Sequence, residues 1–272
     1  MAEAPKESGE ARPARTYATQ VYFSDYGAPH TADSAGNDNG QEEAEQNLEQ
    51  VEELSSSQIQ VWRRYSRYGK MALVNPGPLR RGFRICSWCG FAEPTPPPQP
   101  PSRRKEKFKP HPNPRTGKPC KGFLQTNHLG HEFITDVLEL RFEGALANNP
   151  SYNLWYSVLY ALLEGASEAL GIRRDDLDGT LYRRRGSRIP ALVLFDNVPG
   201  GAGHVQRIAT ELIPAFQAAL RRVDTCECGA ETSCYECLRN YRNQFHHDQL
   251  QRGLARDFLA QVLQTAGVIW LG

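Results

Sequence analysis

The chain has 272 residues, with 32 Lys and Arg against 31 Asp and Glu, so its formal net charge is +1. No apolar run approaches the ~20 residues of a membrane-spanning helix, and the N-terminus lacks the basic-then-apolar order of a secretory signal. These features exclude an integral membrane protein and predict a cytoplasmic, reducing setting, in which the seven cysteines serve as ligands rather than cross-links.

The N-terminal segment, residues 1–58, is rich in Ala, Glu, Gln, Ser, Gly and Pro. This composition predicts a disordered or loosely ordered tail, because it offers little apolar surface to bury. Residues 18–24, with the apolar side chains of Val21, Tyr22 and Phe23, are the exception and can pair as a strand with another segment.

Residues 59–130 are predicted to form a zinc-ribbon-like segment. A short strand leads into Cys86-Ser-Trp-Cys89, half of a zinc knuckle, and a Pro-rich basic linker follows before the chain returns at Cys120. A closed zinc site needs a fourth ligand. We favour His111, which lies on the same return as Cys120, with His128 as the alternative.

The remainder, residues 131–272, alternates strand and helix patterns, which gives an α+β fold. Residues 133–142 predict a half-buried strand, and residues 151–170 predict an amphipathic helix. The apolar run 189–196 predicts a buried strand, and a Gly-rich turn and a second helix follow, with a break near Ala215 caused by Pro214. Residues 254–266 predict a terminal helix.

Two close cysteine pairs near the C-terminus are the strongest chemical signal in the sequence. Four thiols within a dozen residues can converge on one Zn²⁺ without ordering a long loop, whereas disulfide pairing suits small secreted scaffolds. Four thiolates leave no position for water, so the site would be structural. The predicted ligands are Cys226, Cys228, Cys234 and Cys237.

A catalytic alternative rests on the Gly-rich turn. Asp196 ends the buried strand and His204 closes the turn, and together with Glu164 they could hold Mg²⁺ for phosphodiester hydrolysis. Such residues more often cap the turn itself. The sequence contains no Gly-x-x-x-x-Gly-Lys-Ser/Thr motif, and therefore no ATPase of the P-loop kind.

Basic, amide and aromatic residues are interleaved after the C-terminal cysteines, a composition suited to phosphate contact and base stacking. A polar helix face docked on the zinc site would have a similar composition. The candidate nucleic-acid-binding residues are Arg239, Tyr241, Arg242 and Arg252.

Several segments together resemble the MrfA-type zinc-binding domain, which is found at the C-terminus of many DEAD/DEAH-box helicases of DNA repair and of DISARM-type phage defence. The resemblance covers roughly residues 60–265. It rests on the segments 83–90, 129–138, 160–165, 194–204 and 233–238, with Asn243-Gln244.

The resemblance implies a zinc-holding accessory module of a helicase or translocase system, with DNA or the motor protein as partner and the four C-terminal cysteines as ligands of one Zn²⁺. A second Zn²⁺ would occupy the ribbon. Members of the family usually carry the motor in the same chain or act beside one, and these 272 residues contain no motor motif. The chain is therefore expected to be non-catalytic, as a stand-alone subunit, a detached C-terminal piece or a truncated product.

Overall fold

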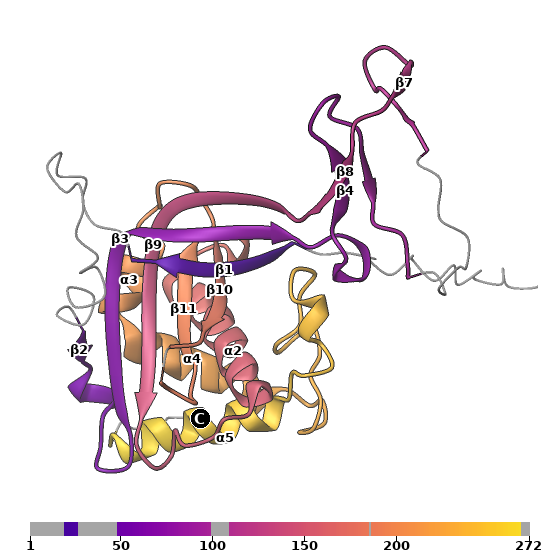
Figure 1. Ribbon diagram of the computed structural model, residues 1–272. Helices are drawn as coiled ribbons and strands as arrows, with labels where there is room; N and C mark the ends of the chain where they lie inside the picture. Colours follow the sequence, from indigo (N-terminus) through magenta and orange to yellow (C-terminus); the bar gives the residue numbers. More distant parts are fainter. Residues whose placement is uncertain (1–18, 27–47, 99–108, 185, 268–272) are drawn as a thin grey trace, which may run out of the picture. The chain divides into compact units, whose positions relative to one another are not determined.

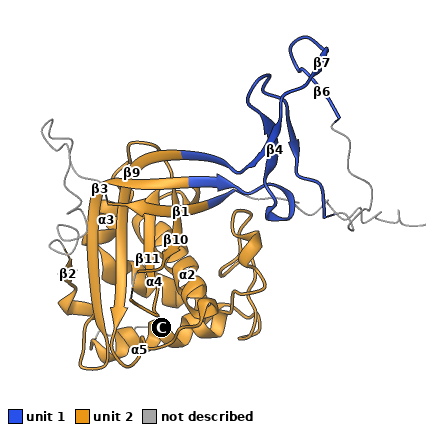
Figure 2. Ribbon diagram, in the orientation of Figure 1, with its two compact units in different colours: residues 1–20, 73–131 blue, residues 21–72, 132–272 orange. Residues whose placement is uncertain are grey.

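The computed structural model describes residues 19–26, 48–98, 109–184 and 186–267 (Figure 1). The chain divides into two compact units, one of residues 1–20 and 73–131 and a larger one of residues 21–72 and 132–272 (Figure 2). In the described part, no helix is long and apolar enough to cross a membrane.

The unit boundaries differ from those predicted from sequence. Residues 59–72, which were expected in the zinc ribbon, belong to the larger unit. Two parts of the predicted tail, residues 20–25 and 49–54, form regular structure there, since they pair with or pack against a strand that follows them. The linker residues 99–108 lie outside the described residues.

The larger unit is built on a sheet with strand order β1-β3-β9-β11-β10, in which β2 also pairs with β3. β11 runs antiparallel to both of its neighbours. The last residues of β3 and the first residues of β9 are assigned to the smaller unit. The strands are β1 (Gln20–Asp25), β2 (Glu49–Gln50), β3 (Gln60–Asn75), β9 (Leu129–Glu143), β10 (Leu177–Tyr182) and β11 (Ala191–Asp196).

The sheet is strongly curved, because its two outermost strands meet. The hydroxyl of Thr180 in β10 donates a hydrogen bond to the carbonyl of Val21 in β1 over 3.0 Å, although the two strands stand at opposite ends of the strand order. The rings of Phe23 and Tyr182 lie edge to face with centroids 5.0 Å apart. The concave face is therefore enclosed by the sheet itself.

Helices cover the other face of the sheet (Figure 1). Leu138, Leu140 and Phe142 alternate along β9 toward them and pack with Trp155 in one apolar core. A side chain at Gly165 would collide with the backbone of α4, so this glycine allows close helix packing. The helices are α2 (Tyr152–Leu170), α3 (His204–Thr210), α4 (Leu212–Thr225) and α5 (Arg252–Thr265).

The enclosed face explains why β9 is more buried than predicted. Its residues from Thr135 to Phe142 are all buried, rather than every second one. Val137 joins a small apolar cluster on the concave side, and Glu139 is fully buried between two arginines. Glu139 accepts hydrogen bonds from Arg141 (2.7 Å) and is ion-paired with Arg64 (3.0 Å).

The predicted second helix is two helices. α3 ends at Thr210, α4 begins at Leu212, and the break falls at Glu211, before the predicted position. Pro214 stands in the first turn of α4, where a missing backbone N–H costs no hydrogen bond.

The smaller unit has two short sheets. β4 (Phe83–Cys86) lies between β5 (Ala92–Pro94) and β8 (Leu124–Asn127), and both pairings are antiparallel. A separate ladder joins β6 (His111–Pro112) to β7 (Pro119–Cys120), with His111 opposite Cys120. These pairings bring the two halves of the predicted ribbon together.

Candidate metal centres

The four C-terminal cysteines converge on one point. Their sulfur atoms lie 3.5 Å apart for Cys226 and Cys228, 3.5 Å for Cys226 and Cys234, 3.7 Å for Cys228 and Cys237, and 3.8 Å for Cys234 and Cys237. A Zn–S bond of ~2.3 Å places the sulfurs of a tetrahedral site ~3.8 Å apart, whereas a disulfide bond is ~2.05 Å long. The donor set and its spacing therefore fit a zinc ion, and all seven cysteines of the chain are free.

Tight turns hold these thiols in place. The backbone N–H of Cys234 donates to the sulfur of Cys237 (3.2 Å), and the carbonyl of Cys234 accepts from the N–H groups of Leu238 (3.1 Å) and Arg239 (2.9 Å). Cys237 and Leu238 are fully buried in the core beneath the helices. The cluster is thus continuous with the hydrophobic core of the larger unit.

Two arginines tie the same cluster to the helices. Arg252, at the start of α5, donates to the carbonyls of Cys228 (3.0 Å) and Val223 (2.7 Å). Arg222 of α4 donates to the carbonyl of Cys237 (3.2 Å) and is ion-paired with Glu164 of α2 (3.4 Å). These contacts join the cysteine turns to three helices.

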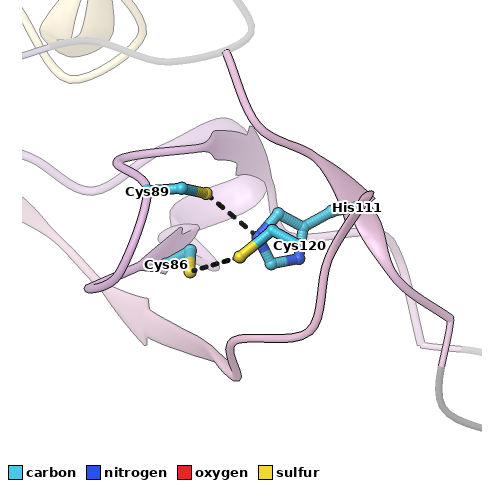
Figure 3. A group of neighbouring side chains, drawn as sticks. All are labelled: Cys86, Cys89, His111 and Cys120. Carbon is cyan, nitrogen blue, oxygen red and sulfur yellow. Dashed lines mark hydrogen bonds between the residues drawn. The ribbon is translucent and has the colours of Figure 1, made fainter. Parts of the chain in front are cut away.

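The second cluster lies in the smaller unit and contains Cys86, Cys89, His111 and Cys120 (Figure 3). The sulfurs of Cys86 and Cys120 are 4.0 Å apart, and His111 Nε2 lies 3.2 Å from the sulfur of Cys89. The donor atoms all lie within 4.8 Å of one another. A set of three thiols and one imidazole fits a closed structural zinc site.

Local packing places His111 and Cys120 in this cluster. His111 is buried, and its ring stacks on Phe91 with centroids 4.9 Å apart. A Cβ at Gly122 would lie 2.6 Å from the sulfur of Cys86, so only glycine fits beside the cluster. His128, the alternative ligand, is exposed and is not part of the group.

The thiol pKa values differ within each cluster. Burial raises the pKa of Cys86, but N–H groups of Cys89 and Trp88 outweigh it and lower the value to about 7. Burial and neighbouring thiols raise the pKa of Cys237 and of Cys228. Thiolates this close repel one another, and a bound cation removes that repulsion, so metal binding would release protons.

The three residues of the catalytic alternative do not converge. The carboxylate of Asp196 is buried and accepts N–H groups from Ala202 (2.6 Å), His204 (3.0 Å) and Val205 (2.9 Å). Glu164 is paired with Arg174 (2.9 Å). Throughout the described ranges, the groups able to hold a metal are the two cysteine-containing clusters. The carboxylate of Asp196 therefore stabilises the Gly-rich turn by accepting its backbone N–H groups.

The predicted nucleic-acid-binding residues have different surroundings. Tyr241 is 59% exposed, and Arg242 lies at the surface 3.7 Å from Asp175. Arg239 is half-buried and donates to the hydroxyl of Ser233 (2.9 Å). Arg252 is buried and engaged with the cysteine turns, so its expected role in contacting nucleic acid is at odds with the structure. Its sequence pattern could not show that it points inward.

A known family matches the part of the chain that contains the C-terminal cysteine cluster. Residues 158–238 match the MrfA Zn-binding domain, and the matched range includes all four C-terminal cysteines. Over this range the chain is similar to an MrfA-type zinc-binding domain. The range runs from within α2 through β10, β11, α3 and α4 to the cysteine turns, and the ribbon cluster at Cys86 lies outside it.

Two known proteins are similar to this chain over parts of their length. The Druantia protein DruE of Escherichia coli (strain UMEA 4076-1) is 28% identical over 214 residues, which cover 71% of this chain and 12% of DruE. The DUF1998 helicase MrfA bound to DNA aligns with 92% of this chain and 25% of its own, at 13% identity and a TM-score of 0.43. MrfA in another crystal structure aligns with 75% of this chain at 14% identity and a TM-score of 0.36. The chain thus spans a quarter or less of each.

Proposed function

We propose that this chain is a zinc-stabilised, non-catalytic accessory module of a DNA helicase or translocase system, acting in DNA repair or phage defence. Its partners would be DNA and a DEAD/DEAH-box motor. The observation that carries the proposal is the closed four-thiolate cluster, which is tied by Arg222 and Arg252 to the helices of the domain.

The chemistry of both clusters supports a structural role for zinc. Cys226, Cys228, Cys234 and Cys237 would hold one ion, and Cys86, Cys89, Cys120 and His111 would hold the other. When bound, each ion supplies positive charge that neutralises the thiolates and fixes the turns. A fourth protein ligand leaves no position for a reactive water.

The contacts of Asp196 argue against the nuclease alternative. A carboxylate that accepts three backbone N–H groups has few lone pairs left for a metal. The match to the MrfA Zn-binding domain, together with the resemblance to the C-terminal domain of DEAD/DEAH-box helicases, supports a helicase setting instead.

Metal analysis and complex formation test this proposal. Purified chain should hold two zinc ions, and Cys89→Ser and Cys234→Ser should each hold one. Fewer than one tightly bound zinc per chain would refute it.

The chain should also elute with a DEAD/DEAH-box motor encoded beside it in size-exclusion chromatography. DNA incubated with the chain and Mg²⁺ or Mn²⁺ should stay intact, whereas cleavage abolished by Asp196→Ala with the fold retained would establish the nuclease.

A further inference from the structure

The charge of the chain is divided between its two units. Residues 73–131 contain eleven lysines and arginines against two glutamates, although the whole chain has a net charge of only +1. The rest of the sequence is therefore net acidic. A polyanion such as DNA would therefore be attracted mainly to the smaller unit.

The smaller unit also presents aromatic side chains beside its metal cluster. Trp88, between the two cysteines of the knuckle, is 74% exposed, and Phe123 is 75% exposed. Cys86 pairs with Leu124 at the end of the β4–β8 ladder, so both aromatic residues lie at that end. A Cβ at Gly122 would lie 3.2 Å from the indole of Trp88, which shows that the ring lies against this glycine.

Cationic side chains follow on the same return. Lys118 and Lys121 flank Cys120, and both are exposed, as is Arg115. The one glutamate among the described residues of this unit, Glu93, is ion-paired with Arg84 and does not offset them. An exposed tryptophan on a rigid knuckle with lysines beside it has the composition of a base-stacking platform.

We infer that the smaller unit binds single-stranded DNA, with Trp88 stacking on an unpaired base and Lys118 and Lys121 contacting phosphates. Stacking requires a base outside a duplex, so single strands should bind more tightly than the same sequence paired. This inference rests on the proposed function, and it assigns DNA contact to residues other than Arg239 and Arg242, the candidates named from the sequence.

The C-terminal knuckle offers a matched comparison. Tyr235 also lies between two cysteines, Cys234 and Cys237, one position earlier in its knuckle than Trp88, and is 64% exposed. Its surroundings differ in charge, since residues 224–248 carry five Asp and Glu against two Arg. Each knuckle therefore exposes an aromatic ring between its cysteines, but the two rings have different electrostatic surroundings.

Fluorescence anisotropy with a labelled 12-nucleotide single strand, measured over a range of NaCl concentrations, tests the inference. Trp88→Ala should weaken binding about tenfold or more, Trp88→Phe should keep most of the affinity, and Tyr235→Ala should leave it unchanged. Each of Lys118→Gln and Lys121→Gln should reduce the slope of log affinity against log salt by about 0.7. Every variant should first be shown to hold two zinc ions.

Three results with the variants would overturn the inference. These are unchanged DNA affinity in Trp88→Ala, weaker binding in Tyr235→Ala instead, or loss of motor binding rather than DNA binding in Trp88→Ala. The last result would identify a protein-docking surface. Absence of any DNA binding would also refute it, while two zinc ions and elution with the motor would still support the accessory role.

Discussion

Arg252 offers a sharp test of how the C-terminal cluster is held. Replacing it with methionine keeps most of the apolar stem but removes the donors to the carbonyls of Cys228 and Val223. Each hydrogen bond from a charged donor contributes ~1.5–3 kcal/mol, and part of the loss is offset because a charge no longer has to be buried. We expect a net destabilisation of about 2–4 kcal/mol.

The assay is thermal unfolding of the zinc-loaded chain, together with zinc release to a chromophoric chelator. For a unit of this size the loss corresponds to about 5–15 °C in melting temperature. Zinc release should be faster, because the turn at Cys228 loses its anchor. Arg256→Met is the matched control, because Arg256 lies one turn later on α5, is partly exposed and is paired with the adjacent Asp257. Equal stability of the two variants would refute the reasoning, and DNA affinity should not change in either.

Two further substitutions test buried charges. Glu139→Gln should destabilise the protein by about 3–5 kcal/mol in urea unfolding, because two arginines stay buried beside a neutral group. Glu143→Gln is the control and should cost less than ~1 kcal/mol, because the side chain of Glu143 is 48% exposed. Equal unfolding midpoints for the two variants would contradict this. Asp196→Asn should cost about 2–4 kcal/mol, because one amide oxygen replaces two carboxylate oxygens that accept three N–H groups, and an unchanged midpoint would show that the turn does not depend on the carboxylate.

Short-range patterns in the sequence predicted much of the metal chemistry. Zinc ligands separated by two or three residues are brought together by local turns, so the spacing of Cys226 to Cys237 was sufficient to propose their convergence. His111 was favoured because it shares a return with Cys120, and the β6–β7 ladder indeed sets these two residues opposite each other. The helix 152–170 likewise follows from its apolar spacing and from Gly171, which ends it in the left-handed conformation.

Local sequence patterns could not predict contacts between residues that are far apart in the sequence. The strand β10 was not predicted, because Asp178 and Gly179 interrupt its apolar residues. A Cβ at Gly179 would lie 2.8 Å from the side chain of Leu159 of α2, so the helix packs closely against this strand. β1 was expected to need a partner, but its own sequence could not show that β3 pairs with it or that Thr180, 159 positions from Val21, donates a hydrogen bond to it. The inward orientation of Arg252 depends on carbonyls of distant turns for the same reason.

Loss of zinc should affect the two units differently, because their hydrophobic cores differ in size. Apart from Pro and Gly, the buried residues among the described part of the smaller unit are Cys86 and His111, so this unit has almost no core besides its metal ligands. Cys237 instead belongs to the large core of the other unit. We expect Cys89→Ser to make residues 73–131 sensitive to protease while the melting temperature of the larger unit stays the same. Cys234→Ser should lower that temperature by more than about 10 °C, because zinc binding contributes directly to folding. If both variants melted alike, the clusters would be parts of one cooperative unit and the ribbon would not depend on its own zinc.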